Sequence, residues 1–231
     1  MEPVPSHRIE RTRNRHSRAV LRGETVVIRL ARNLSAREER EHVEILLRRM
    51  QRVVHRERQR TLVRPFSPLL EGKDDLTLTL PGGRRCRFTL RPGKRTAARY
   101  RGGGWDVTVG PGTGRSALHR FLWRLLRRSE RPSLAAFVRE VNRRTLRVPI
   151  RDVTLRYATS QWGSCSARGC ISLNAALLVL PPEMLEYVIV HELAHRLHRG
   201  HTKAYWRTVS QAFPGYQETR RKLRNYRLSP L

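Results

Sequence analysis

Residues 187–201, YVIVHELAHRLHRGH, constrain the fold more than any other stretch of the chain. Apolar residues fill most of positions 187–194, so the segment is expected to be a helix that is buried over most of its surface. Polar side chains interrupt it, and burying an imidazole or a carboxylate without a partner costs free energy. We therefore expect these side chains to bind something inside the fold: His191, Glu192, His195, His198 and His201.

The first two histidines of this segment have the spacing of a metal site. His191 and His195 are four residues apart, so their side chains project from one face of a helix at neighbouring turns. Two neutral imidazoles placed in this way can bind one metal ion, and Glu192 lies where a carboxylate reaches metal-bound water without being a ligand. This HExxH pattern is the zincin signature, in which the glutamate is the general base. The sequence predicts one zinc ion per chain, with Glu192 as the catalytic residue.

The third ligand has to come from a chain that turns back. A catalytic zinc usually takes three protein ligands and keeps one position open for water. Along a continuous helix His198 would lie about 10 Å from His191, too far to share an ion. Gly200 is expected to end the helix, which makes His201 the predicted third ligand, at the third-histidine spacing of metzincins. Glu218, on a following helical segment, is the alternative.

The motif HELAH is accompanied by a WGSC segment, an ISLN segment, a proline pair and a distal tryptophan. With these motifs the sequence resembles the YgjP-like metallopeptidase family, relatives of the SprT-like zincins. The resemblance implies a zinc-dependent peptidase that acts on a peptide or protein substrate. In two places the chain departs from the family pattern: Gly200 precedes His201 where asparagine is common, and Cys170 replaces a polar residue. The resemblance covers roughly residues 150–210 and rests on WGSC (162–165), ISLN (171–174), the proline pair 181–182, HELAH (191–195), His201 and Trp206.

The predicted elements place strands before helices along the chain, an order typical of the α+β class. Residues 1–16 are polar and basic and are expected to form a disordered arm. Residues 17–110 are expected to form an antiparallel β-rich region with one helix. In this region we expect a hairpin at 17–30, a helix capped by Ser35, and a meander of the strands LTLTL, CRFTL, TAARY and WDVTV.

Residues 111–231 are expected to form a helical, zincin-like catalytic region. Amphipathic patterns predict two helices there, 115–128 and 133–146, the second capped by Ser133. Two strands within residues 153–174 flank the loop TSQWGSCSARG. A proline pair then opens the histidine helix, since proline is tolerated in a first turn, and two more helical segments follow.

Three further side chains, Trp162, Tyr205 and His198, are candidate contacts to the substrate or the transition state. Tyr205, His198 or a nearby arginine would stabilise the oxyanion that forms during attack on a carbonyl. Trp162 forms either a wall of the substrate cleft or part of the core. The strand at 170–174 is expected to hold an extended substrate by β-addition.

The chain has 48 Lys plus Arg against 19 Asp plus Glu, a net charge of +29. This excess predicts nonspecific affinity for polyanions, nucleic acid included. Only four of the basic residues are lysines, and the arginines are spread along the chain, a bias that GC-rich codon usage also produces. No run of about 18 apolar residues predicts a membrane span. The polar N-terminus and three unevenly spaced cysteines favour a cytoplasmic protein.

Two other functions remain as alternatives. A metal-activated water beside arginines also suits phosphoanhydrides, which would make the protein a metal-dependent phosphohydrolase acting on nucleotides. Such sites usually hold Mg²⁺ or Mn²⁺ with carboxylates, whereas this cluster is rich in imidazole. The other alternative is a SprT-like protease associated with nucleic acid, which salt-sensitive DNA binding would indicate.

Overall fold

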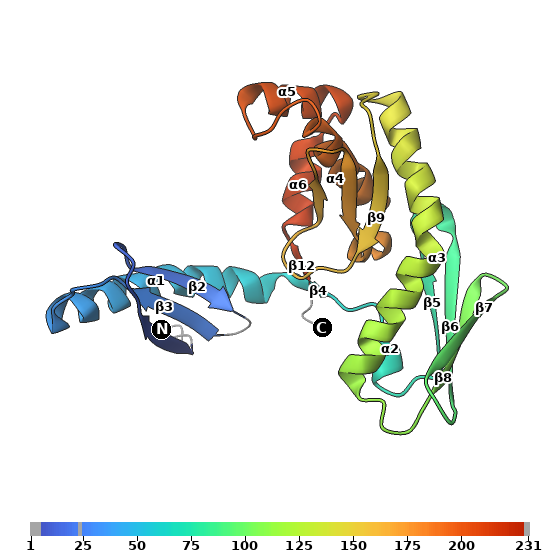
Figure 1. Ribbon diagram of the computed structural model, residues 1–231, viewed down its shortest axis with the longest axis horizontal. Coiled ribbons are helices and arrows are strands. Elements are labelled where there is room, and N and C mark those ends of the chain that lie inside the picture. Colours follow the sequence, from blue (N-terminus) through green and yellow to red (C-terminus); the bar gives the residue numbers. More distant parts are fainter. Residues whose placement is uncertain (1–5, 23–24, 229–231) are drawn as a thin grey trace. The chain divides into compact units, whose positions relative to one another are not determined.

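The computed structural model describes residues 6–22 and 25–228 (Figure 1). The chain divides into two compact units, one from Met1 to Thr61 and the other from Leu62 to Ser229. The boundary therefore lies near residue 61, not near residue 110 as the sequence predicted. The reason is that the strands between residues 75 and 109 share one hydrophobic core with the helices that follow them.

The first unit combines one long helix with a three-stranded sheet. The sheet has the order β1-β3-β2, with β1 parallel and β2 antiparallel to β3, so the predicted hairpin is confirmed. The predicted capping box is also present, because Ser35 and Glu38 each accept a hydrogen bond from the other's backbone N–H. The elements are β1 (His7–Arg11), β2 (Arg18–Arg22), β3 (Thr25–Leu30) and α1 (Ala36–Gln59), around a core of Val26, Ile28, Leu30, Met50 and Val54.

Strand β1 shows that the predicted disordered arm is wrong for residues 7–11, while residues 1–5 lie outside the described residues. Ile9 is the one apolar residue of HRIER, so no hydrophobic alternation marks this strand. Backbone pairing with β3 holds it instead. Ion pairs add to this pairing, with Arg11 Nη2 2.7 Å from Glu39 Oε2 and Arg29 Nε 2.9 Å from Glu10 Oε2.

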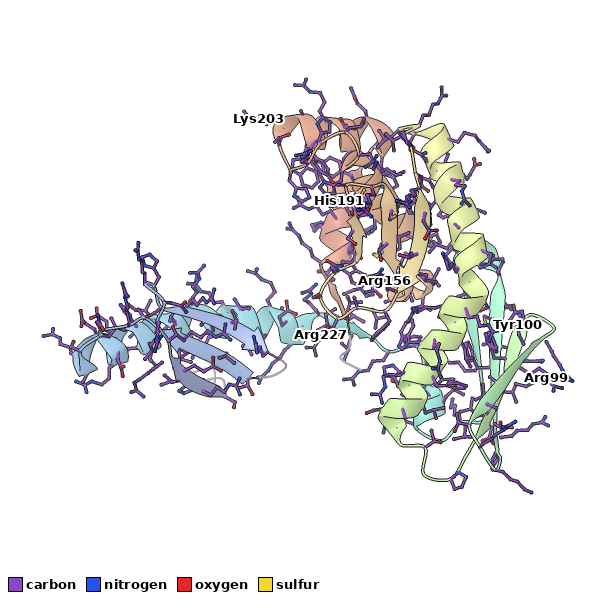
Figure 2. All side chains as sticks on the ribbon, viewed as in Figure 1. Arg99, Tyr100, Arg156, His191, Lys203 and Arg227 are labelled. Atoms are coloured by element: carbon purple, nitrogen blue, oxygen red, sulfur yellow. The ribbon has the colours of Figure 1, made fainter. Side chains whose placement is uncertain are left out.

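The second unit begins with a mixed four-stranded sheet rather than the predicted antiparallel meander. Its order is β5-β6-β8-β7, and β6 and β8 are parallel. The hairpin of β7 and β8 places β8 inside the sheet because Trp105 and Val107 are buried there, whereas Arg99 and Tyr100 on β7 are exposed (Figure 2). The elements are β4 (Thr61–Val63), α2 (Ser67–Leu70), β5 (Asp75–Thr79), η1 (Pro81–Gly83), β6 (Arg85–Pro92), β7 (Ala97–Arg101) and β8 (Gly104–Val109).

One continuous helix, α3 (Arg115–Arg144), replaces the two helices predicted on either side of Pro132. Buried residues continue past the proline, from Leu126 to Leu134 and Val138, so packing holds both halves in line. Ser133 is therefore not a cap. The helix packs against the four-stranded sheet and also against β9 of a second sheet.

The second sheet has the order β10-β11-β9, with β11 in the centre. Strand β10 lies within the stretch that was predicted to be a loop, and it pairs antiparallel with β11. This corrects the prediction that residues 170–174 hold a substrate by β-addition, because β11 already pairs on both of its edges. The remaining elements are β9 (Asp152–Arg156), β10 (Gly163–Cys165), β11 (Cys170–Asn174), η2 (Ala175–Val179), α4 (Pro182–Ala194), α5 (Lys203–Ala212), α6 (Tyr216–Leu223) and β12 (Tyr226–Leu228).

Within the described residues, no helix is long and apolar enough to cross a membrane.

Candidate active site

Helix α4 begins at Pro182, as predicted, but it ends earlier than the sequence indicates. The last helical residue is Ala194, and the backbone N–H groups of Leu197 and His198 both donate to the Ala194 carbonyl in the turn that follows. The expectation that the helix continues to Gly200 is therefore wrong. No glycine or proline marks the true end, so the sequence carries no stop signal there.

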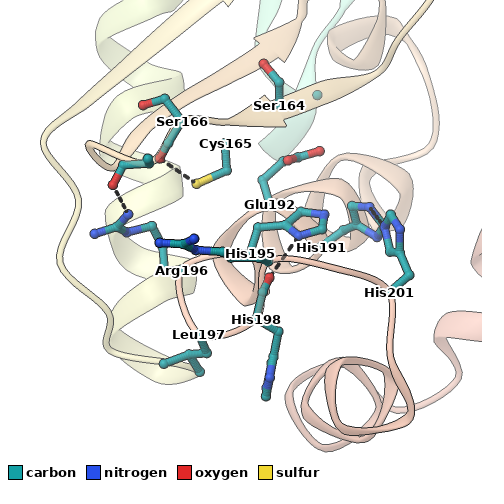
Figure 3. A pocket seen from close by; sticks show the side chains of 13 residues that line it. Ser164, Cys165, Ser166, His191, Glu192, His195, Arg196, Leu197, His198 and His201 are labelled. Carbon is teal, nitrogen blue, oxygen red and sulfur yellow. Dashed lines mark hydrogen bonds between the residues drawn. The ribbon is translucent and has the colours of Figure 1, made fainter.

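Three histidine side chains come together at the end of α4 (Figure 3). His191 and His195 extend from the helix and its cap, and His201 returns from the loop that follows. One ring nitrogen of each lies within 4.8 Å of the others, and Nε2 of His191 lies 3.2 Å from Nε2 of His201. Two nitrogens bound tetrahedrally to one zinc at 2.0–2.1 Å would be about 3.3 Å apart. The three imidazoles could therefore hold a zinc ion.

The electrostatics of the cluster favour neutral imidazoles, the form that binds metal. Burial, with His195 and His201 nearby, lowers the pKa of His191 to about 3. Burial and His195 also lower the pKa of His201. The lowered pKa values disfavour protonation of His191 and His201, which leaves their ring nitrogens free to bind a metal cation.

A main-chain carbonyl orients one of the three rings, and a buried tyrosine holds the backbone that carries another. Nδ1 of His195 lies 3.2 Å from the carbonyl oxygen of His198, a contact that leaves its Nε2 free for a metal. The hydroxyl of Tyr205 donates to the carbonyl oxygen of His191 at 3.0 Å. Tyr205 has no exposed surface, so it supports α4 and is not placed to touch a substrate.

His201 is exposed, and aromatic stacking holds its ring. Its ring stacks on Trp206, with centroids 5.4 Å apart and planes 19° apart. Trp206 in turn stacks on Tyr216 at 5.4 Å and 13°, and the guanidinium of Arg220 lies 4.5 Å from the Trp206 ring. Helices α5 and α6 therefore orient the ring of His201, which itself lies in a loop.

Glu192 is buried beside the cluster, with 5% of its surface exposed. Burial raises the pKa of its carboxyl to about 8, and a cation bound by the histidines would favour the ionised form. Strand β10 packs directly against it. A Cβ atom at Gly163 would lie 2.7 Å from Oε1 of Glu192, closer than real Cβ contacts.

A cavity of about 900 Å³ opens on this group, bounded by β10, the end of α4 and the loop to His201 (Figure 3). The cavity wall does not include Trp162, which packs against the core instead, or Tyr205. The wall includes Gly163, Ser164, Cys165, Ser166, Ala167, His191, Glu192, His195, Arg196, Leu197, His198, Arg199 and His201.

The two alternative ligands lie elsewhere. His198 Nε2 lies 2.9 Å from the Thr208 hydroxyl, and its ring does not belong to the histidine group. Glu218 pairs with Lys222 at 3.2 Å on the surface of α6. Sequence reasoning missed Gly163 and Arg196 in the cavity wall. The glycine of the WGSC segment was a signal that something approaches the backbone closely.

A buried glutamate next to three convergent histidines is the arrangement of a metal-dependent hydrolase. A comparison with protein families identifies the class of hydrolase more narrowly. The family model described as YgjP-like, metallopeptidase domain, matches residues 15–226. The chain belongs to the YgjP-like metallopeptidase family.

Among solved structures, the chain is similar to the crystal structure of the metallopeptidase zymogen of Pyrococcus abyssi abylysin. The two sequences are 25% identical, and the match covers 42% of this chain and 98% of that chain, with a TM-score of 0.34. No curated protein matches the chain.

Proposed function

We propose that this protein is a zinc peptidase in which His191, His195 and His201 hold the metal and Glu192 is the general base. The observation that carries the proposal is the convergence of three imidazole nitrogens beside a buried carboxylate. A bound zinc ion lowers the pKa of water and polarises a substrate carbonyl. Glu192 would accept the proton of the attacking water at its carboxylate and deliver it to the leaving amine.

The open sheet edge beside Glu192 is a reason to propose a peptide as the substrate. The outer edge of β9 is covered, because Arg127 Nε donates to the Leu155 carbonyl at 2.9 Å and Arg131 Nε donates to the Val153 carbonyl at 3.3 Å. Strand β10 is the other edge of this sheet, and it borders the cavity. An extended peptide can add to such an edge through main-chain hydrogen bonds. We therefore assign substrate binding to β10.

The experiment that tests this function uses one protein sample purified without chelator. We expect elemental analysis to find one zinc per chain, and the same sample to cleave peptides but not nucleoside triphosphates. His191→Ala and His195→Ala should lose the zinc. Glu192→Gln should keep the zinc and lose at least about 10²-fold in turnover, the range of a general base.

Absence of zinc from the wild-type sample would contradict the proposal. Turnover of nucleotides without turnover of peptides would favour the phosphohydrolase instead. Normal turnover by Glu192→Gln would show that this carboxylate is not the base.

A further inference from the structure

The wall of the active-site cavity is unevenly charged. Arg196 and Arg199 are among its lining residues, and the one carboxylate among the described lining residues is that of Glu192. Glu192 lies at the histidine cluster, so it does not neutralise the arginines as an ion-pair partner would. One part of the cavity therefore presents positive charge to whatever enters.

Arg196 is fixed in position but keeps its charge. Its Nη1 donates to the Ala167 carbonyl at 2.7 Å, and its Nε donates to the Pro149 carbonyl at 3.2 Å. Carbonyl groups orient a guanidinium without cancelling its charge, and the remaining N–H groups can bind a carboxylate. Arg199 is exposed.

The direction of β10 relates these arginines to the scissile bond. Gly163, at one end of the strand, packs on Glu192, and Ala167, just past the other end, bonds to Arg196 (Figure 3). A peptide that adds antiparallel to β10 runs from Arg196 towards Glu192. The substrate residues that pass Arg196 are then those on the amino-terminal side of the scissile bond. At a rise of about 3.3 Å per residue, this region lies within about four residues of that bond.

We propose that the enzyme prefers substrates with an acidic side chain within about four residues on the amino-terminal side of the scissile bond, and that Arg196 and Arg199 recognise it. This preference rests on the proposed peptidase function.

The first test is digestion of a peptide library prepared from a whole proteome, with the cleavage sites mapped by mass spectrometry. We expect Asp and Glu to be enriched, and Lys and Arg to be depleted, in the four positions before the cut. Equal representation of acidic and basic residues at these positions would overturn the proposal.

Variants show whether the two arginines cause the preference. Arg199→Gln should reduce the enrichment of acidic residues, and Arg199→Glu should reverse it towards basic residues. Arg196→Gln tests the second group, although it also releases a contact to Ala167, so the exposed Arg199 is the cleaner position. Arg207→Gln is the matched control, since Arg207 is exposed on α5 and lies outside the cavity wall. An unchanged preference in both Arg199 variants would exclude the assignment.

A binding measurement separates this proposal from the proposed function. Three fluorescent decapeptides differ only in having Glu, Gln or Lys at their variable positions, and their affinity for the Glu192→Gln protein is measured by anisotropy. We expect the Glu peptide to bind at least about 5-fold more tightly than the Lys peptide. A difference of this size is what a single ion pair contributes when it is exposed or partly buried. If no peptide is cleaved, the peptidase function fails while the binding order still decides the acidic preference. If peptides are cleaved but bind equally, only the acidic preference fails.

Discussion

Gly163 occupies a position where a single methyl group would displace the Glu192 carboxylate, the proposed general base. The missing side chain leaves the space that the Glu192 carboxylate fills, since a Cβ would lie 2.7 Å from Oε1 and 2.9 Å from Cγ. The glycine has no positive φ, so the reason for it is close approach and not backbone conformation. The WGSC segment therefore packs directly against the Glu192 carboxylate.

We expect Gly163→Ala to keep zinc and to lose about 10²-fold in kcat, because a small displacement of a reacting group has effects of that size. Steady-state kinetics with zinc analysis of the same samples would check this. Gly114→Ala is the control, because a Cβ there would meet no atom within 4 Å. If Gly163→Ala retains the wild-type kcat, then the carboxylate does not depend on β10 for its position.

The ligand assignment gives a second prediction at the scale of single residues. His201→Ala should lose zinc heavily, because it removes one of three ligands. His198→Ala should cost at most the 10- to 100-fold, about 1.4 to 2.8 kcal/mol, typical of a residue that supports a ligand. The His198→Ala variant keeps the main-chain carbonyl that contacts His195. Glu218→Gln should have no effect, since this side chain pairs with Lys222 on the surface.

Titration of each variant with zinc against a competing chelator decides the assignment. A large loss in Glu218→Gln would indicate a glutamate ligand and a rearrangement of α6. Equal losses in His198→Ala and His195→Ala would mean that the loop after α4 folds differently when metal is bound.

At the scale of elements, α5 and α6 act on the metal site through stacking. The Trp206 ring lies against His201, and Tyr216 from α6 lies against Trp206. We expect Trp206→Ala to weaken zinc binding by about 10-fold, a size typical of residues that orient a ligand. Trp206→Phe should recover most of the affinity, because a stacked ring remains. Zinc titration checks both variants, and circular dichroism shows that α5 is still folded. Full affinity in Trp206→Ala would exclude a role in positioning His201.

The sequence predicted the elements whose signals are local and missed those that depend on distant contacts. The proline pair and the apolar run mark α4, and Ser35 with Glu38 marks α1. By contrast, β10 has only three residues and is a strand only because β11 lies beside it. The continuity of α3 through Pro132 likewise depends on packing against two sheets. The cluster of three histidines was predictable from spacing, but the edge strand that borders it was not.

At the scale of the whole molecule, the dominant property is the charge of +29. Many arginines have no carboxylate nearby in the part of the chain that the structure describes. Arg120 and Arg124, for example, are one turn apart on α3, and the guanidinium carbon of Arg124 lies 4.9 Å from the centre of the Phe121 ring. A surface of this kind attracts polyanions over distances comparable to the Debye length, about 10 Å at 0.1 M salt.

We therefore expect the protein to bind DNA and RNA with little sequence preference, and with an affinity that falls steeply as salt rises. Each phosphate neutralised by a guanidinium releases counterions, so log K should fall linearly with log salt at about 0.9 per contact on duplex DNA. Fluorescence anisotropy with two unrelated duplexes at several salt concentrations measures the slope. Replacing both Arg120 and Arg124 with Gln should make the slope shallower if α3 contributes. Binding that persists at high salt, or that distinguishes the two duplexes strongly, would contradict a purely electrostatic attraction and would favour a protease that works on nucleic acid.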